Sequence, residues 1–135
     1  MSFVEVSHTA DVKIRATAPT LETLFSEAFA ALMQVLYGPD RKGGKEREIS
    51  LDAEDRESLL RDFLSEVLFM AEVDGLVFSR ADIHLDGRRL IATLDGEPFD
   101  RHRHAQGTEV KGISYSGLAI THDENGYMLD IVFDV

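Results

Sequence analysis

Residues 127–135 read Tyr-Met-Leu-Asp-Ile-Val-Phe-Asp-Val, an alternating stretch that predicts a β-strand with one buried face. Successive side chains of a strand point to opposite faces. One face is apolar and consists of Tyr127, Leu129, Ile131, Phe133 and Val135. The other face mixes apolar and acidic side chains: Met128, Asp130, Val132 and Asp134. Its two carboxylates mark either the solvent face of a sheet or part of a cation site.

Two stretches upstream of this strand have helical periodicity. Apolar residues recur at helical spacing over residues 21–36, after a candidate N-cap at Thr20 and before the helix-ending pair Gly38-Pro39. A second helix starts at a cap between residues 52 and 55, buries a stripe over residues 59–71, and ends near residues 74–75. Two helices of this length require a sheet or each other to cover their apolar stripes.

The remaining segments predict strands. Residues 3–18 are extended, residues 47–51 form a short strand, and Asp86-Gly87 predicts a hairpin turn in which both residues have positive φ. Residues 97–108 form a polar loop, and residues 109–122 form a long strand bent at one of its glycines. The order is β-β-α-β-α-β-β-β-β. We therefore expect an α+β fold in which residues 1–135 form a single-domain sandwich, with two helices packed on a mixed or antiparallel sheet.

Composition narrows the class of function. The chain has 25 acidic residues against 14 basic ones, a net charge of −11, so it is a poor candidate for binding RNA or DNA by itself. It has no cysteine, which excludes disulfides and thiolate chemistry. No apolar run reaches the ~18 residues of a membrane span, and the N-terminus does not resemble a signal peptide. We expect a cytoplasmic protein without a membrane partner.

Candidate metal ligands lie near both ends of the chain. His8 and Asp11 form an H-x-x-D element, which is weak evidence by itself. If the ends meet, Asp130, Asp134 and a free carboxylate at Val135 would join them. Oxygen ligands of this kind favour Ca²⁺ or Mg²⁺ over zinc or copper.

The polar loop after residue 96 holds a second set of candidates. His102 and His104, with Glu97, suggest either a zinc pair without a recognisable third ligand or a flexible contact loop, and we favour the contact loop. Lys111 lies among strand-forming residues, where it either balances clustered carboxylates, contacts a phosphate or is simply solvated.

Taken together, these pieces resemble the archease family over nearly the whole chain. The resemblance rests on five segments: His8-Thr9-Ala10-Asp11-Val12, the 59–64 helix segment, Gly96-Glu97 with Asp100 and His104, Glu109-Val110-Lys111-Gly112, and Phe133-Asp134-Val135. Each piece alone is unspecific, but an H-T-A-D element with a near-terminal D-V is specific in combination.

The resemblance implies a cytoplasmic protein cofactor of an RtcB-type RNA ligase, which acts in tRNA splicing and RNA repair. Such a cofactor promotes guanylylation and multiple turnover of the ligase and is not itself the enzyme. It would meet RNA and GTP only through the ligase. The resemblance also implies that Asp11 and Asp134 bind a divalent cation, with Ca²⁺ favoured over Mg²⁺, and that His8 and Asp130 are their neighbours. Lys111 matches a lysine that the family uses.

Two other interpretations stay open at this point. The same residues would suit a small metal-dependent phosphoesterase, although two-metal hydrolysis usually needs more ligands. A chaperone-like adaptor with purely structural carboxylates is the other. The sequence also departs from the family pattern at Lys13, Gly112 and Ser116, which leaves the metal positions unchanged but affects the surface expected to meet a partner.

Overall fold

The computed structural model describes residues 1–8 and 11–135, and the side chains of these residues except 5–8 and 115–116. The helices and strands follow one another in the predicted order. They are β1 (Ser2–His8), β2 (Asp11–Ala18), α1 (Leu21–Tyr37), β3 (Lys45–Asp52), α2 (Arg56–Asp74), β4 (Leu76–Asp86), β5 (Arg89–Pro98), β6 (Gly112–Asp123) and β7 (Gly126–Asp134).

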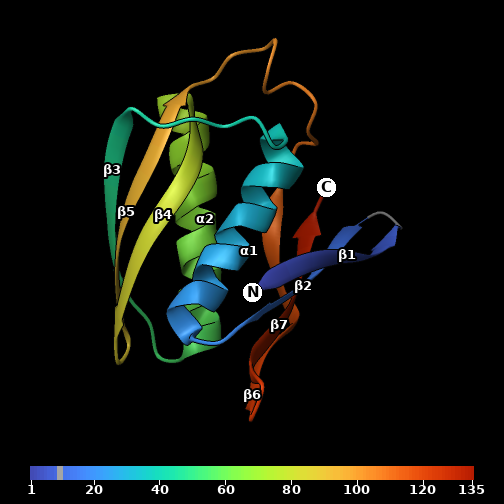
Figure 1. Cartoon of the computed structure of the whole chain (residues 1–135), viewed down its shortest axis with the longest axis vertical. Helices are drawn as coiled ribbons and strands as arrows, with labels where there is room; N and C mark the ends of the chain where they lie inside the picture. Colours follow the sequence, from blue (N-terminus) through green and yellow to red (C-terminus); the bar gives the residue numbers. More distant parts are fainter. Residues whose placement is uncertain (9–10) are drawn as a thin grey trace.

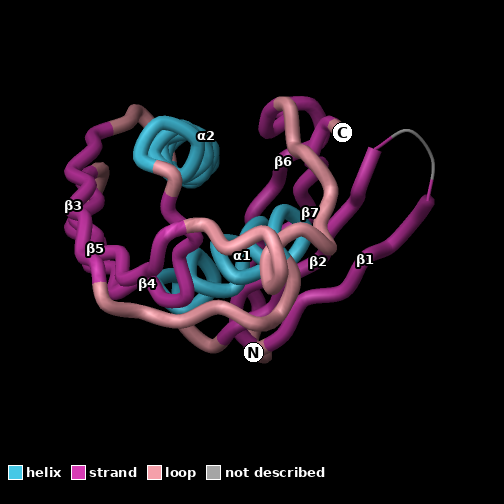
Figure 2. Tube along the Cα trace, turned by 90° about the horizontal axis from the view of Figure 1, so that it is seen from above, coloured by secondary structure: helices cyan, strands magenta, loops and turns pink. Residues whose placement is uncertain are grey.

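The strands form two antiparallel sheets, a finer division than the one sheet expected from sequence. A four-stranded sheet has the order β1-β2-β7-β6, and a three-stranded sheet has the order β3-β5-β4. Both helices lie between the sheets (Figures 1 and 2). Helix α1 contacts β2 and β4, whereas α2 contacts β6 and β3, so each helix touches both sheets. The α+β prediction is confirmed.

Both helices begin and end where the sequence predicts. The Thr20 side chain accepts a hydrogen bond from the Thr23 amide at 3.2 Å, and the Thr23 side chain accepts one from the Thr20 amide at 3.2 Å, which completes a capping box. Asp55 caps α2 through the Ser58 amide at 2.7 Å, and this bond lowers the pKa of Asp55. Gly75 ends α2 in the left-handed conformation, with φ of 63°.

One continuous core joins the helices to both sheets. Phe63 of α2 lies between Phe25 and Phe29 of α1, with ring centroids 6.5 and 6.4 Å apart, and all three rings are buried. The apolar face predicted for residues 127–135 is the core face of β7, where Leu129, Ile131 and Phe133 are buried. Because this face is fixed, Asp130 and Asp134 are held on the outer face of the four-stranded sheet.

The β4–β5 hairpin corrects one detail of the sequence prediction. The strands pair up to Asp86 and Arg89, so the two turn residues are Gly87 and Arg88 rather than Asp86 and Gly87. Gly87 has φ of 60°, and no described residue other than glycine has positive φ. A glycine with positive φ at the first turn position is the type II′ arrangement, so the turn lies one residue later than Asp-Gly suggested.

The bend predicted in the long strand is present at Gly117, which has φ of 75° within a register shift between Ser114 and Ala119. The polar loop lies slightly later in the chain than predicted, because β5 continues to Pro98 and β6 begins only at Gly112 rather than at residue 109. Among the described residues, neither helix is long and apolar enough to cross a membrane.

Candidate functional site

The candidate site lies at the end of β7, the strand that pairs with both β2 and β6. Asp134 is the register partner of Asp11 on one side and of Gly112 on the other. Residues directly opposite in an antiparallel pair have Cβ atoms about 4.5–5.5 Å apart. The fold therefore brings Asp11 and Asp134, 123 positions apart in the chain, into direct opposition.

Two carboxylates facing each other across a ladder repel one another. Asp11 is partly exposed and Asp134 is exposed, and among the described side chains none donates a hydrogen bond or forms an ion pair with either. A cation between them would remove this repulsion, and two carboxylates are a donor set that Ca²⁺ and Mg²⁺ accept. The two residues therefore fit a divalent cation, although within the described residues no group of three or more His, Cys, Asp or Glu is arranged for one.

The backbone of Lys111 lies beside this pair. Its backbone N–H donates to the Asp134 carbonyl at 2.7 Å, one residue before β6 begins, and its side chain is exposed. Next to it, a Cβ added to Gly112 would lie 3.9 Å from Asp134 Oδ2, an ordinary contact distance. An alanine would therefore fit here, and glycine leaves slightly more room beside the carboxylate.

The other proposed ligands are placed less directly. His8 pairs with Val12 through the backbone, so it lies at the same end of the sheet, but its side chain and residues 9–10 lie outside the described part of the chain. Val135 follows Asp134 directly and packs against the core. Its role as a ligand, like that of His8, stays a prediction.

Asp130 is not brought to the Asp11–Asp134 end. Its carboxylate accepts from Arg15 Nε at 2.8 Å and Nη2 at 3.3 Å, and this contact raises the pKa of Arg15. Asp130 and Asp134 are four positions apart along the strand, a distance of about 13 Å. The carboxylate of Asp130 serves an exposed ion pair in the structure, whereas that of Asp134 does not.

A second cluster of charged side chains lies in the loop that follows β5. Glu97 accepts from the Lys42 amide at 2.7 Å, from Arg103 with both of its carboxylate oxygens, and from His104 Nε2 at 3.2 Å. The Arg103 guanidinium, together with the Lys42 amide, lowers the pKa of Glu97 to about 2 despite the opposing effect of desolvation. The same pair raises the pKa of Arg103.

His104 is the centre of this cluster and is only 1 % exposed. Its Nδ1 accepts the Asp100 N–H at 2.9 Å, so the proton of the neutral ring is on Nε2 and points at Glu97. The rings of Tyr37 and Phe99 pack around it. Both ring nitrogens are thus occupied, which leaves none for zinc, while His102 is exposed. The H-x-H segment is not a zinc pair, and the buried His104 cannot touch a partner directly.

Arg103 is the residue that sequence reasoning missed. It joins Glu97, Asp100 and Asp40, yet arginine in a polar loop looks like a solvated side chain. The signal available was Asp100, three residues before Arg103, which forms a local turn by accepting from the His102 amide at 2.8 Å. That turn aims Arg103 and His104 back at Glu97.

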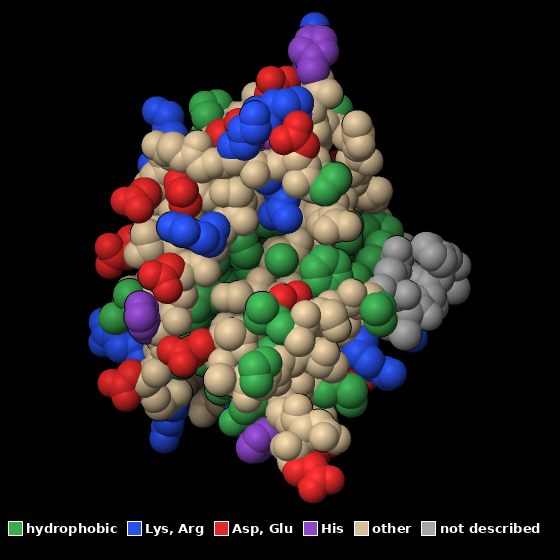
Figure 3. Space-filling view, in the orientation of Figure 1, with side chains coloured by type: hydrophobic (Ala, Val, Ile, Leu, Met, Phe, Trp, Pro, Cys, Tyr) green, Lys and Arg blue, Asp and Glu red, His purple; other side chains and the backbone are tan. Residues whose placement is uncertain are grey.

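The face of the molecule in Figure 3 shows acidic and basic side chains intermingled around its edge, with apolar and neutral surface towards the centre. Over the described residues of this face, basic side chains form no continuous surface of the kind that binds nucleic acid.

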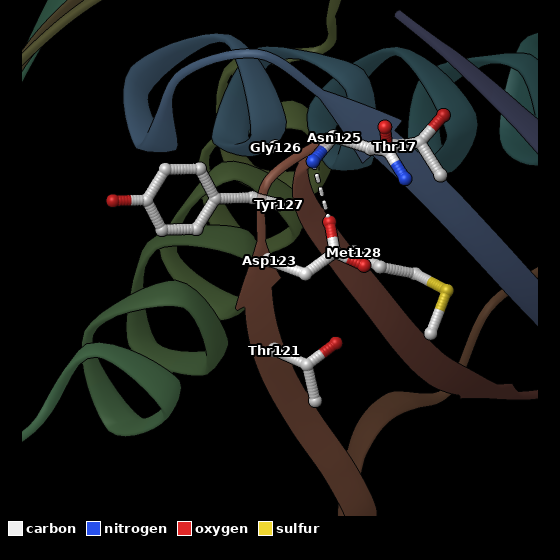
Figure 4. Close-up of a pocket in the computed structure, with 7 residues that line it drawn as sticks. All are labelled: Thr17, Thr121, Asp123, Asn125, Gly126, Tyr127 and Met128. Carbon is white, nitrogen blue, oxygen red and sulfur yellow. Dashed lines mark hydrogen bonds between the residues drawn. The ribbon is translucent and has the colours of Figure 1, made fainter.

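A pocket of about 380 Å³ lies at the opposite end of β7, around the β6–β7 turn (Figure 4). It is lined by Thr17, Thr121, Asp123, Asn125, Gly126, Tyr127 and Met128. Asp123 accepts the Asn125 N–H at 2.8 Å, and the Tyr127 ring points away from the other side chains (Figure 4). Because the start of β7 at Gly126 is eight positions, about 26 Å, from Asp134, the pocket is not part of the carboxylate site.

Comparison with known proteins decides the family. A family model described as the archease protein family (MTH1598/TM1083) matches residues 3–135. The chain belongs to the archease family. The archease of Methanosarcina mazei is 34 % identical over 96 % of this chain and 93 % of its own length. That of Methanopyrus kandleri is 33 % identical over the whole of both chains.

Solved structures agree with this archease fold. The solution structure of protein 1598 of Methanobacterium thermoautotrophicum superposes with a TM-score of 0.86, at 26 % identity, and covers 98 % of both chains. The crystal structure of a Thermotoga maritima archease, described as a possible chaperone, gives a TM-score of 0.69 at 22 % identity, covering 96 % of this chain and 94 % of its own. The second likeness concerns the fold alone.

Proposed function

We propose that this archease is the protein cofactor of an RtcB-type RNA ligase, and that a divalent cation held by Asp11 and Asp134 is part of its action. The observation that carries the proposal is the opposition of these two carboxylates beside Lys111 in a member of this family. Ca²⁺ is the favoured cation and Mg²⁺ the alternative, because both take oxygen ligands.

The role of each residue follows from its chemistry. Asp11 and Asp134 would hold the cation, which when bound supplies positive charge at the end of the sheet. The exposed ammonium of Lys111 would then contact a phosphate or carboxylate of the partner complex. His8 and Val135 remain candidate ligands, and Asp130 a neighbour further along the strand.

The net charge of −11 supports a protein partner rather than direct binding of nucleic acid. An acidic cofactor suits a basic cleft built for RNA and nucleotide, and complementary charge speeds such an encounter. RNA and GTP would therefore reach this chain only through the ligase. We place the pair of proteins in the cytoplasm, with no role for DNA or a membrane.

The test is RNA joining by the cognate ligase at limiting enzyme, with GTP, metal and RNA ending in a cyclic phosphate held constant. We expect addition of the chain to convert about one turnover into many, and Asp134→Ala or Asp11→Ala to abolish this effect. Asp82→Ala is the matched control, because Asp82 is an exposed carboxylate on the other sheet, 72 % exposed at its side chain.

Other outcomes would point elsewhere. If folded wild-type chain loaded with cation leaves ligation unchanged, the proposal fails. Turnover of a phosphodiester by this chain alone, lost in Asp11→Ala, would favour the metal-dependent phosphoesterase. Ligase activation that survives Asp134→Ala would favour an adaptor in which the carboxylates are structural.

A further inference from the structure

Lys111 is reached by a loop that spans the molecule. Residues 99–111 leave β5 of the three-stranded sheet, cross the C-terminal end of α1, and enter β6 of the four-stranded sheet (Figure 2). The side chains of residues 105–109 are all exposed. Apolar burial therefore does not hold this part of the loop, and its position depends on specific contacts.

The first contact point is the cluster of Glu97, Arg103 and His104. Glu97 belongs to β5 and is thus fixed by the three-stranded sheet, while Arg103 and His104 belong to the loop. Their bonds to Glu97 and the bond from the Asp100 amide to His104 Nδ1 fold the first half of the loop onto that sheet. The His104 side chain is fully buried, so these hydrogen bonds are shielded from water.

The second half of the loop is fixed against α1 and β7. The Thr108 N–H donates to the Val35 carbonyl at 2.7 Å, and the Lys111 N–H donates to the Asp134 carbonyl at 2.7 Å. At Gly107 the backbone passes so close to α1 that an added Cβ would lie 1.9 Å from the Leu36 carbonyl oxygen. These contacts, with the buried Val110, fix the far end of the loop, and His104 fixes the loop seven residues before Lys111. Loss of the His104 contacts would therefore let the residues between move and strain the Thr108 and Lys111 hydrogen bonds.

We propose that Glu97, Arg103 and His104 are positioning residues, which act through the loop to hold Lys111 beside the Asp11–Asp134 pair. Their part in ligase activation rests on the proposed function, whereas their control of the Lys111 backbone does not. The buried histidine is thus a structural anchor for a functional lysine.

Amide hydrogen exchange of the whole chain tests the positioning directly. In His104→Ala we expect the Thr108 and Lys111 amides to exchange at least about tenfold faster, while the paired amides of β4 and β5 keep their rates. Arg103→Lys, which keeps the charge but loses the two-point contact with Glu97, should move the same two amides by less. Arg103 is partly exposed, so this variant is expected to fold even if His104→Ala does not.

Ile83→Val is the matched control, because Ile83 is a buried residue of β4 remote from the loop. It should accelerate exchange only for amides that open with the whole fold, and not selectively at Thr108 and Lys111. Unchanged Thr108 and Lys111 amides in both loop variants would overturn the proposal. So would equal acceleration in Ile83→Val.

A double-mutant cycle tests the functional link. If His104 acts through Lys111, the variant with both His104→Ala and Lys111→Ala should lose no more ligase activation than Lys111→Ala alone. Additive losses would overturn the link. A ligase that ignores the wild-type chain would instead refute the proposed function, and the exchange experiment would still decide the positioning.

Discussion

Two regions of this molecule gather carboxylates and treat them in opposite ways. Glu97 is half of a partly buried ion pair, accepts from a backbone amide and a histidine as well, and has a pKa of about 2. Asp11 and Asp134 face each other at the end of a sheet, and the described side chains give neither of them a partner. A carboxylate whose bonds are satisfied holds structure, whereas a pair left in mutual repulsion is available to a ligand.

The largest loss of stability should come from a substitution at Glu97, whose carboxylate has all of its hydrogen-bond partners within the protein. Glu97→Ala leaves the buried His104 ring without its acceptor and, among the described residues, leaves Arg103 with only Asp40 and Asp100, and we expect a loss of about 1–3 kcal/mol in the free energy of unfolding. Urea denaturation of the Glu97→Ala variant and of the wild type measures this loss. Asp95→Ala serves as the control, since among the described residues the Asp95 carboxylate accepts from the Gly44 amide alone, on a nearby exposed segment. Equal losses in both variants would contradict the distinction.

The same region should make stability depend on acid. The folded-state pKa of Glu97 is about 2 against an ordinary value of 4.5, so its contribution is present above pH 4.5 and is lost as the pH falls towards 2. Asp100 adds to this in the same direction, because the His102 amide lowers its pKa. Denaturation followed between pH 6 and pH 2 should show a smaller fall in Glu97→Gln than in the wild type. Parallel curves would show that the pair does not control acid stability.

The stability of the Asp11–Asp134 end of the sheet should instead depend on a bound cation. A divalent cation at a hundredfold excess over its Kd should stabilise the fold by about 2.7 kcal/mol, seen as a rise in Tm. Asp11→Asn and Asp134→Asn should abolish that rise. Without cation, both variants should be as stable as the wild type or more so, by about 0.2–1 kcal/mol, because the repulsion is gone. If the cation raises the Tm of both variants as much as that of the wild type, Asp11 and Asp134 do not form the cation site.

The smallest effect is expected from Arg15→Ala, which tests whether Asp130 belongs to the same site as Asp134. Arg15→Ala removes an exposed ion pair, with side chains 47 % and 44 % exposed, and should leave the free energy of unfolding almost unchanged, because water screens such a pair. It should also leave the cation-induced rise in Tm intact. If Arg15→Ala instead changes the affinity for cation, Asp130 belongs to the site after all.

The sequence predicted the parts of this molecule that depend on local chemistry. Thr20 and Asp55 cap helices because their side chains reach amides within three residues, and the alternation over 127–135 fixes which face of β7 is buried. The partition into two sheets was not predictable in this way, because strand adjacency is a property of the whole chain. The hairpin turn was misplaced by one residue because Asp-Gly fits more than one turn type.

The candidate site was predicted unevenly for the same reason. The resemblance to archeases selected Asp11, Asp134 and Lys111, and the strand register then placed them together. Periodicity alone left the two carboxylates of β7 equivalent, and only the cross-strand partner, Arg15, distinguishes Asp130. His104 was misjudged because a histidine in a polar loop gives no local sign that aromatic rings and Glu97 will enclose it.

Gly107 is a surface position that should nevertheless tolerate substitution poorly. It is exposed, yet the space where its first side-chain atom would lie is filled by the backbone of α1. In a saturation library, position 107 should therefore behave like a core residue, with alanine already depleted. In homologues that have another residue at this position, the loop between β5 and β6 would have to follow a different path past α1 before it reaches the lysine. The residue at this position is thus a simple marker for archeases in which the loop passes α1 in a different way.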